Sequence, residues 1–189
     1  SYRIALTRFA NRFQDAHLSI SFSRPFEDLQ EAGIYPFFQN GSFVVKEIDE
    51  RYGAQTAELR GATLINCDGR SSNRLFRQRV LSWRGRPSIK ADWYKLAPFL
   101  LVDYGAESLP APNTCQFRVK NRTVKLSLKW TSVTGQQIEE KLKQLVSTEN
   151  RRLKLEKFDA GNALWVNLPT FSVNEKQDVE AMHALIESL

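Results

Sequence analysis

The sequence predicts an α+β protein, because segments with helical spacing of apolar residues lie between segments in which apolar and polar residues alternate. Residues 136–146 give the clearest helical spacing, and residues 116–130 contain two alternating runs around a short turn. The chain of 189 residues is 42% hydrophobic and 25% charged, as globular domains are. This excludes a collagen, a disulfide scaffold and a wholly disordered chain. No apolar run approaches the roughly 20 residues that cross a bilayer.

The first 40 residues predict a helix followed by a strand. Residues 2–14 have an amphipathic helical pattern, and residues 17–23 alternate. We expect residues 24–41 to form a loop with a short helical piece that ends in the turn pair Asn40-Gly41. The expected apolar face of the helix consists of Tyr2, Ala5, Leu6, Phe9 and Phe13, and the strand is expected to turn Leu18, Ile20 and Phe22 inward.

The middle of the chain alternates short strands and short helices separated by turn signals. Gly61 is expected to end one helix, and Asp68-Gly69 is a strong turn pair. Ser71 or Ser72 is expected to cap another helix. The predicted elements are a strand at 43–48, a helix at 54–59, a strand at 62–67, a helix at about 73–82 and a helix within 91–103 that Pro98 interrupts.

The last third predicts a hairpin, a helix, two strands and a final helix. The hairpin pairs residues 116–120 with 123–130, and Ser172 with Glu175 forms a capping box before the final helix. The remaining predicted elements are a helix at 136–146, strands at 152–158 and 163–168, and a helix from about residue 174 onward.

The net charge of +6 is concentrated in two stretches that contain no acidic residue. Such stretches attract nucleic acid or acidic peptides, although solvated helix and strand faces explain them equally. No nucleic-acid-binding motif accompanies the charge. The basic residues are Arg70, Arg74, Arg77, Arg79, Arg84, Arg86 and Lys90 in the first stretch and Arg118, Lys120, Arg122, Lys125 and Lys129 in the second.

The usual catalytic and metal-binding motifs are absent. The sequence contains no Walker A, GxGxxG, HExxH or GxSxG pattern. Cys67 and Cys115 form no CxxC pair, and two cysteines with two histidines match no zinc finger. We therefore expect no metal and no cofactor. The two cysteines are either buried thiols or, in an exported protein, a disulfide.

His17 is the one titratable residue that the spacing singles out. It lies at the junction between the predicted helix and the first alternating segment, where polar groups are exposed at element ends. Histidine titrates near neutrality, which suits a general base. A structural role, such as a hydrogen bond to a loop carbonyl, is the alternative. His183 is expected to be a surface or packing residue.

Three pieces of the chain, in order, resemble the S41 family of serine peptidases, which includes tail-specific, C-terminal-processing and tricorn-like proteases. The first is residues 13–20, Phe-Gln-Asp-Ala-His-Leu-Ser-Ile, which resembles the family's D-x-H motif before a strand. The second comprises residues 41–45 and 56–69, which are similar to the family's PDZ-like module, although Ala62 replaces its usual aspartate and Asn66-Cys67-Asp68-Gly69 its usual I-D-G. The third is residues 163–171, which resembles its Y-I-x-L-P-x-F strand.

The resemblance implies three parts: an N-terminal helix-strand element (1–40), a PDZ-like module with an insertion (41–130) and the start of an α/β catalytic core (131–189). The module is expected to be a partly open β-barrel with helices. In the family the nucleophilic serine and its lysine or glutamate partner follow the third motif, so we expect this chain to lack the nucleophile and to be inactive alone. In tricorn-like members the histidine of the first motif is the general base, which His17 would match; in lysine-dependent members that stretch is structural.

PDZ-like modules bind polypeptide C-termini by adding a strand to a sheet edge and capturing the carboxylate with loop amides. The best candidate loop is Asn40, Gly41, Ser42 and Phe43, since glycine permits a close backbone approach; a plain turn is the alternative. The helix that begins near Asn73 is expected to flank this groove, and the insertion at 84–113 to lie close enough to cover it.

The resemblance predicts a polypeptide substrate and a periplasmic or extracellular location. It also implies that the rest of the peptidase chain is a partner. Two other functions stay open: a non-catalytic PDZ-like scaffold that binds peptide ends, and a basic nucleic-acid binder whose affinity falls steeply with salt.

Overall fold

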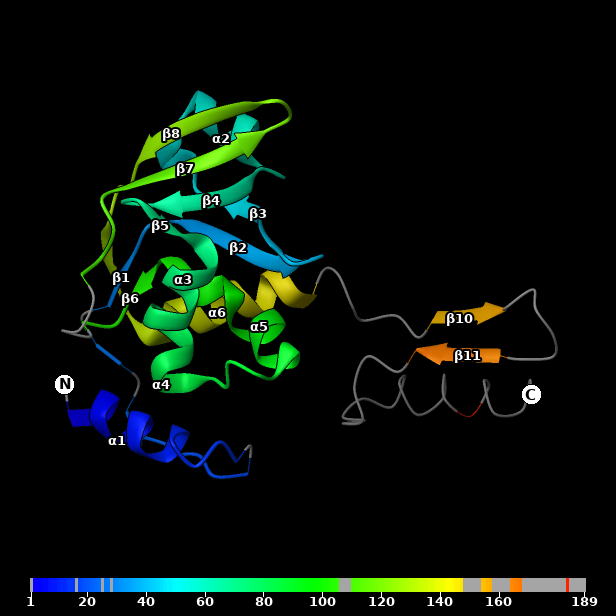
Figure 1. Ribbon diagram of the computed structural model, residues 1–189. Coiled ribbons are helices and arrows are strands. Elements are labelled where there is room, and N and C mark those ends of the chain that lie inside the picture. The colour runs from blue at the N-terminus through cyan, green and yellow to red at the C-terminus, as the bar shows by residue number, and fades with distance from the viewer. Residues whose placement is uncertain are drawn as a thin grey trace. The chain divides into compact units, whose positions relative to one another are not determined.

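The computed structural model describes residues 2–15, 17–24, 26–27, 29–105, 110–147, 154–157, 164–167 and 183. The chain divides into two compact units, residues 1–141 and 142–189. The first unit contains two open antiparallel sheets with helices against them (Figure 1), which confirms the mixed α+β class.

The larger sheet follows the strand order β2-β3-β4-β7-β8, and β5 pairs with β4. All its pairs are antiparallel, and β2 lies at one edge. Tight turns with positive φ at both positions join β2 to β3 at Asn40-Gly41 and β4 to β5 at Asp68-Gly69. The strands are β2 (Ile34–Gln39), β3 (Ser42–Ile48), β4 (Thr63–Cys67), β5 (Arg70–Ser71), β7 (Thr114–Val119) and β8 (Arg122–Ser127).

The smaller sheet has the order β6-β1-β9. It continues along the chain into the larger sheet, because β1 is followed after two residues by β2. The backbone amide of Ala32 donates to the carbonyl of Leu101 at 3.0 Å, which extends the β1–β6 pairing. The strands are β1 (Leu29–Glu31), β6 (Val102–Asp103) and β9 (Thr131–Val133).

A nearly continuous helical run crosses one face of the larger sheet. The Ser71 hydroxyl accepts a hydrogen bond from the Arg74 amide at 3.4 Å and caps its start. Pro98 lies in the first turn of η3, where a missing amide proton costs little. The helices of the first unit are α1 (Tyr2–Asn11), η1 (Glu50–Tyr52), α2 (Ala54–Leu59), α3 (Ser72–Phe76), η2 (Arg77–Leu81, a π-helical turn), α4 (Ser82–Arg84), α5 (Lys90–Leu96), η3 (Ala97–Leu101) and α6 (Gly135–Ser147), whose last residues fall in the second unit.

One hydrophobic core fills the space between the larger sheet and these helices. Its aromatic centre joins Phe43 of β3, Phe76 of α3 and Trp93 of α5, with ring centroids 5.0–6.2 Å apart. Cys67 and Cys115 face each other across β4 and β7 and form a disulfide. From the sequence, both two buried thiols and a disulfide were possible for these cysteines.

Several predicted elements are confirmed within a few residues: α2, β3, β4, α6, and the β7–β8 hairpin, which turns at Lys120-Asn121 rather than at 121–122. The predicted strand at 17–23 is wrong, because this segment has no strand partner. The loop expected at 24–41 is also wrong in part, since β1 and β2 occupy most of it.

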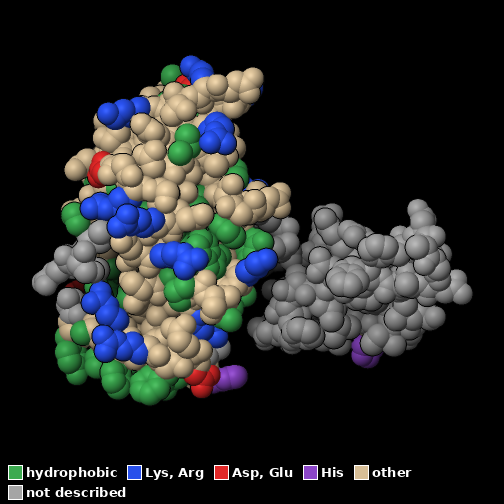
Figure 2. Space-filling view, viewed as in Figure 1, with side chains coloured by type: hydrophobic (Ala, Val, Ile, Leu, Met, Phe, Trp, Pro, Cys, Tyr) green, Lys and Arg blue, Asp and Glu red, His purple; other side chains and the backbone are tan. Residues whose placement is uncertain are grey.

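The face of α1 that contacts the rest of the unit also differs from the prediction. Ile4 and Ala10 are buried, whereas Tyr2, Phe9 and Phe13 of the expected apolar face are exposed. Figure 2 shows these apolar side chains gathered where α1 lies in Figure 1.

In the second unit, β10 (Lys154–Lys157) and β11 (Leu164–Asn167) form an antiparallel hairpin, as their alternation predicts. The predicted final helix lies outside the described residues except at His183, which is helical and exposed.

Candidate functional site

A surface groove of about 410 Å³ opens beside the β2–β3 turn, and we call it the Trp93 groove. Three chain segments form it: the β2–β3 hairpin, the start of the α3–η2 helical run, and the segment that contains α5. In Figure 2 apolar side chains flanked by basic ones cover the region where these elements lie in Figure 1. Its lining residues are Phe38, Gly41, Asn73, Arg77, Pro87, Ser88, Lys90, Trp93 and Tyr94.

Aromatic rings form the apolar wall of the Trp93 groove. The Trp93 ring lies 5.0 Å from Phe38, and its indole Nε1 donates to the carbonyl of Pro87 at 3.0 Å. Tyr94 packs edge-on against Phe38 at 5.5 Å and is 51% exposed. The wall is thus held rigidly at Trp93 and open to solvent at Tyr94, which suits an apolar side chain arriving from outside.

The charge of the groove is positive. The Arg77 guanidinium lies over the Trp93 ring, 5.0 Å from its centroid, and Lys90 also lines the groove. No acidic residue lines the groove, and neither cation has an ion pair within the part of the chain that the structure describes. The groove therefore favours a ligand that carries both an apolar group and a negative charge.

The four residues that the sequence proposed for carboxylate capture have different environments. Gly41 lines the groove, whereas Phe43 is fully buried in the core behind it. Asn40 and Gly41 are the two central residues of the hairpin turn, and Ser42 is paired with Gln39. Only the glycine of this set thus contributes to the surface of the groove.

The insertion after residue 84 covers much of the β2 edge. Both α5 and η3 pack against β2, and the Leu101 carbonyl accepts from Ala32 just before β2 begins. Within the described chain β2 pairs with β3 alone. Of β2, only Phe38, near the turn, lines the Trp93 groove.

His17 lies apart from the Trp93 groove, at the end of the segment that follows α1. Its side chain is 95% exposed, and its Nδ1 lies 3.1 Å from Oδ1 of Asp15. Hydrogen bonds from the His17 backbone and ring lower the pKa of Asp15. No other contact to His17 is found among the described residues, so Nε2 faces solvent.

The aromatic wall is the part of the site that sequence reasoning missed. Phe38 fell in a segment expected to be a loop, and Trp93 and Tyr94 were assigned only to a helix. The available signal was the aromatic pair Trp93-Tyr94 directly after the basic stretch that ends at Lys90.

Metal and membrane chemistry have no support in the described part of the chain. Among those residues, no cluster of three or more His, Cys, Asp or Glu side chains is placed to hold a metal ion. No described helix is long and apolar enough to cross a bilayer.

Comparisons of the chain with protein-family models, with curated proteins and with solved structures gave no match.

Proposed function

We propose that this chain is part of an S41-like serine peptidase and that its first unit carries a PDZ-like module that binds polypeptide C-termini. The observation that carries the proposal is the Trp93 groove, in which Gly41, the Arg77 guanidinium and the Trp93 ring meet. A polypeptide C-terminus with an apolar last residue offers both groups, because its α-carboxylate and its side chain are attached to the same Cα atom.

In this proposal the last side chain of the peptide packs between Phe38 and Tyr94, and its carboxylate approaches Arg77 and Lys90. Both cations are exposed, so each ion pair contributes modestly and weakens with salt. Specificity then depends mainly on the aromatic wall.

The order of elements also supports the module. Strand β3, helix α2, the turn at Gly61, strand β4 and the turn Asp68-Gly69 follow one another in the order of the motifs that carry the resemblance. The buried Cys67–Cys115 disulfide supports the periplasmic or extracellular location, because such bonds persist in oxidising compartments.

The Asp15–His17 pair is consistent with a tricorn-like general base. A carboxylate on Nδ1 orients an imidazole so that Nε2 can take a proton from a hydroxyl. In this proposal the serine comes from the remainder of the peptidase, and the exposure of His17 leaves room for it.

A non-catalytic peptide-binding scaffold is the second candidate. All residues that line the groove lie between Phe38 and Tyr94, so binding requires no contribution from the strands after residue 150. Under this alternative, peptide binding is the whole function.

Peptide binding by the 189-residue chain tests the proposal. We expect a fluorescent peptide with a free C-terminus and an apolar last residue to bind, and the same peptide amidated at its end to bind much more weakly. Arg77→Gln should reduce affinity roughly two- to fivefold at low salt, since an exposed ion pair contributes up to about 1 kcal/mol.

Arg74→Gln is the matched control, because Arg74 is exposed on the same helical run and does not line the groove. Equal affinity for the free and amidated peptides would refute recognition of C-termini. Joining the chain to a serine-bearing second half and assaying proteolysis with His17→Ala then separates the peptidase from the scaffold.

A further inference from the structure

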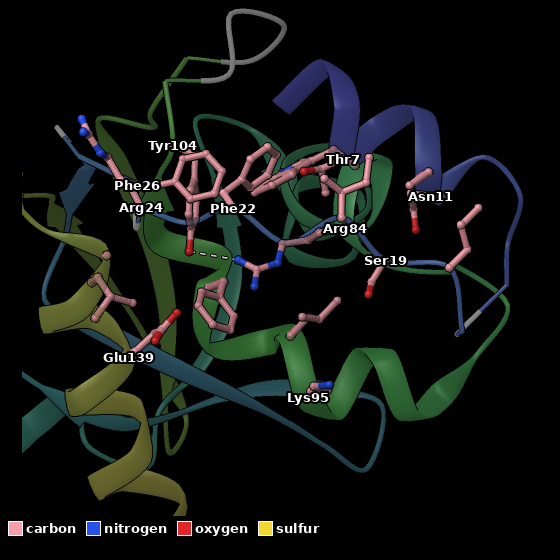
Figure 3. Close-up of a pocket in the computed structure, with 18 residues that line it drawn as sticks. Thr7, Asn11, Ser19, Phe22, Arg24, Phe26, Arg84, Lys95, Tyr104 and Glu139 are labelled. Atoms are coloured by element: carbon pink, nitrogen blue, oxygen red, sulfur yellow. Dashed lines mark hydrogen bonds between the residues drawn. The ribbon is translucent and has the colours of Figure 1, made fainter. Parts of the chain in front are cut away.

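A second cavity of about 410 Å³ lies between the N-terminal segment and the helical layer of the first unit, and Figure 3 shows the residues that line it. We call it the Arg84 cavity. Its walls come from α1, the segment 18–26, α4, α5, η3 and the start of α6. It shares no lining residue with the Trp93 groove, and its volume lies within the usual range for ligand cavities, roughly 300–1,000 Å³.

Aromatic rings make one wall rigid. Trp83, Tyr104 and Phe26 pack pairwise with ring centroids 5.0–6.3 Å apart. Trp83 is buried, and its indole nitrogen donates to the carbonyl of Arg79 at 2.7 Å. A wall of this kind needs little reorganisation when a ligand enters.

The Arg84 guanidinium points from this wall into the cavity (Figure 3). It lies 4.0 Å from the centre of the Phe99 ring, and one of its nitrogens donates to the Tyr104 hydroxyl at 2.9 Å. Within the described chain Arg84 has no carboxylate partner, although Glu139 lines the same cavity. The guanidinium therefore keeps hydrogen-bond donors directed at the space that a ligand would occupy.

The other charged residues that line the cavity are Arg24, whose guanidinium points away from it in Figure 3, Lys95 and Glu139, so cationic residues outnumber the one carboxylate. Burial raises the pKa of Tyr104, so its phenol stays protonated near neutral pH. The apolar lining continues from this wall through half-buried Phe22 (Figure 3), which packs edge-on against Phe26 at 6.0 Å, and it also includes Leu18, which is 45% exposed. A matching ligand carries one negative group and an apolar chain.

We propose that the Arg84 cavity binds a small amphiphilic carboxylate, with the carboxylate paired to Arg84 and the apolar chain packed against the segment 18–26. The argument is charge complementarity in a preformed cavity, because a carboxylate fits the planar donor face of a guanidinium. The inference goes beyond the proposed peptide recognition and does not depend on it.

Calorimetric titration of the 189-residue chain with decanoate, below its micelle concentration, tests this site. We expect saturable binding at the Arg84 cavity, with decanol binding clearly more weakly because it lacks the charge. Arg84→Gln should weaken decanoate binding roughly tenfold to a hundredfold, the value of a hydrogen-bonded charge.

Two control variants separate this site from the groove. Arg74→Gln should leave decanoate affinity unchanged, and Arg77→Gln should leave binding at the Arg84 cavity unchanged and affect only decanoate bound at the Trp93 groove. Arg84→Gln should leave binding of the C-terminal peptide unchanged. If Arg84→Gln lowers the melting temperature strongly, Lys95→Gln is used in its place, because Lys95 is an exposed residue that lines the same cavity. Lys95→Gln should weaken decanoate binding measurably.

The proposal is overturned if decanol binds as tightly as decanoate, if no saturable binding occurs, or if decanoate affinity is insensitive to the cavity variants. Loss of peptide binding in Arg84→Gln would instead show that this cavity receives the polypeptide end, which also contradicts the proposal.

Discussion

At the residue scale, the most constrained charges of the first unit surround Arg51. Its Nη2 lies 2.9 Å from Oδ2 of Asp49 and 3.3 Å from Oε1 of Glu31, and the latter carboxylate is 5% exposed and accepts a hydrogen bond from the Tyr35 hydroxyl. Lys141 of α6 lies 3.6 Å from Glu31 and 3.7 Å from Asp49. The cluster thus joins β1, the end of β3 and the middle of α6 through buried and half-buried charges.

This cluster makes stability depend on pH at the acidic end. The hydrogen bond from Arg51 lowers the pKa of Asp49 from 3.8 to about 2. The stabilisation is therefore complete above about pH 4 and is lost as the pH falls toward 2, a loss of about 2 kcal/mol. Urea unfolding at pH 5 and at pH 2.5 measures it.

Asp49→Asn should remove most of that pH dependence, while Glu50→Gln should keep it, because Glu50 makes no ion pair with the described residues. An unchanged pH profile in Asp49→Asn would contradict the assignment. Gly33 permits the arrangement: its φ is +65°, and an added Cβ would lie 2.8 Å from Cβ of Asp49.

At the element scale, the Asn11 side chain connects α1 to the end of the helical run. Nδ2 of Asn11 donates to the carbonyl of Leu81 at 3.2 Å and to that of Gly85 at 2.8 Å. The last carbonyls of a helix lack hydrogen-bond donors in their own helix, and the Asn11 amide supplies donors to two carbonyls at this end. A Cβ at Gly85 would lie 2.5 Å from Cδ2 of Leu81 and 2.7 Å from Cδ1 of Leu96, so a larger residue there needs both leucine side chains to shift.

Asn11→Ala should lower the free energy of unfolding by about 1–3 kcal/mol, because two carbonyls lose a donor at once. It should also raise hydrogen exchange throughout Tyr2–Asn11. Hydrogen-exchange mass spectrometry measures the second effect, with Arg12→Ala, an exposed neighbour, as the control. Unchanged exchange in α1 would mean that the apolar contacts of Ile4 and Ala10 hold the helix without Asn11.

At the scale of the whole molecule, the disulfide is the strongest single constraint on the first unit. Cys67 and Cys115 are 48 residues apart and enclose the helical run and the insertion, which supply part of the lining of both cavities. Closing that loop restricts the unfolded chain and so stabilises the fold.

Reduction, or the double change Cys67→Ala and Cys115→Ala, should lower the free energy of unfolding by about 3–4 kcal/mol for a loop of this length. Guanidinium unfolding with and without reductant measures the difference. If the protein is denatured without reductant and two free thiols are then detected, the disulfide is absent.

The sequence by itself determined the elements whose signals are local. Asn40-Gly41 and Asp68-Gly69 form the turns their residue types favour, Ser71 caps α3, and the helix at residues 54–59 lies where its spacing places it. These outcomes depend on backbone preferences within a few residues, so they need no knowledge of the rest of the chain. The mixed α+β class follows from them.

Only the tertiary structure decided the sites. The alternation of residues 17–23 predicts a strand, yet the segment has no strand partner, and Leu18, Ile20 and Phe22 line the Arg84 cavity instead. Trp93 could not be placed against Phe38 from the sequence, since 55 positions separate them. A strand needs a partner and a cavity needs walls from distant segments, and both conditions are set by packing that no local pattern encodes.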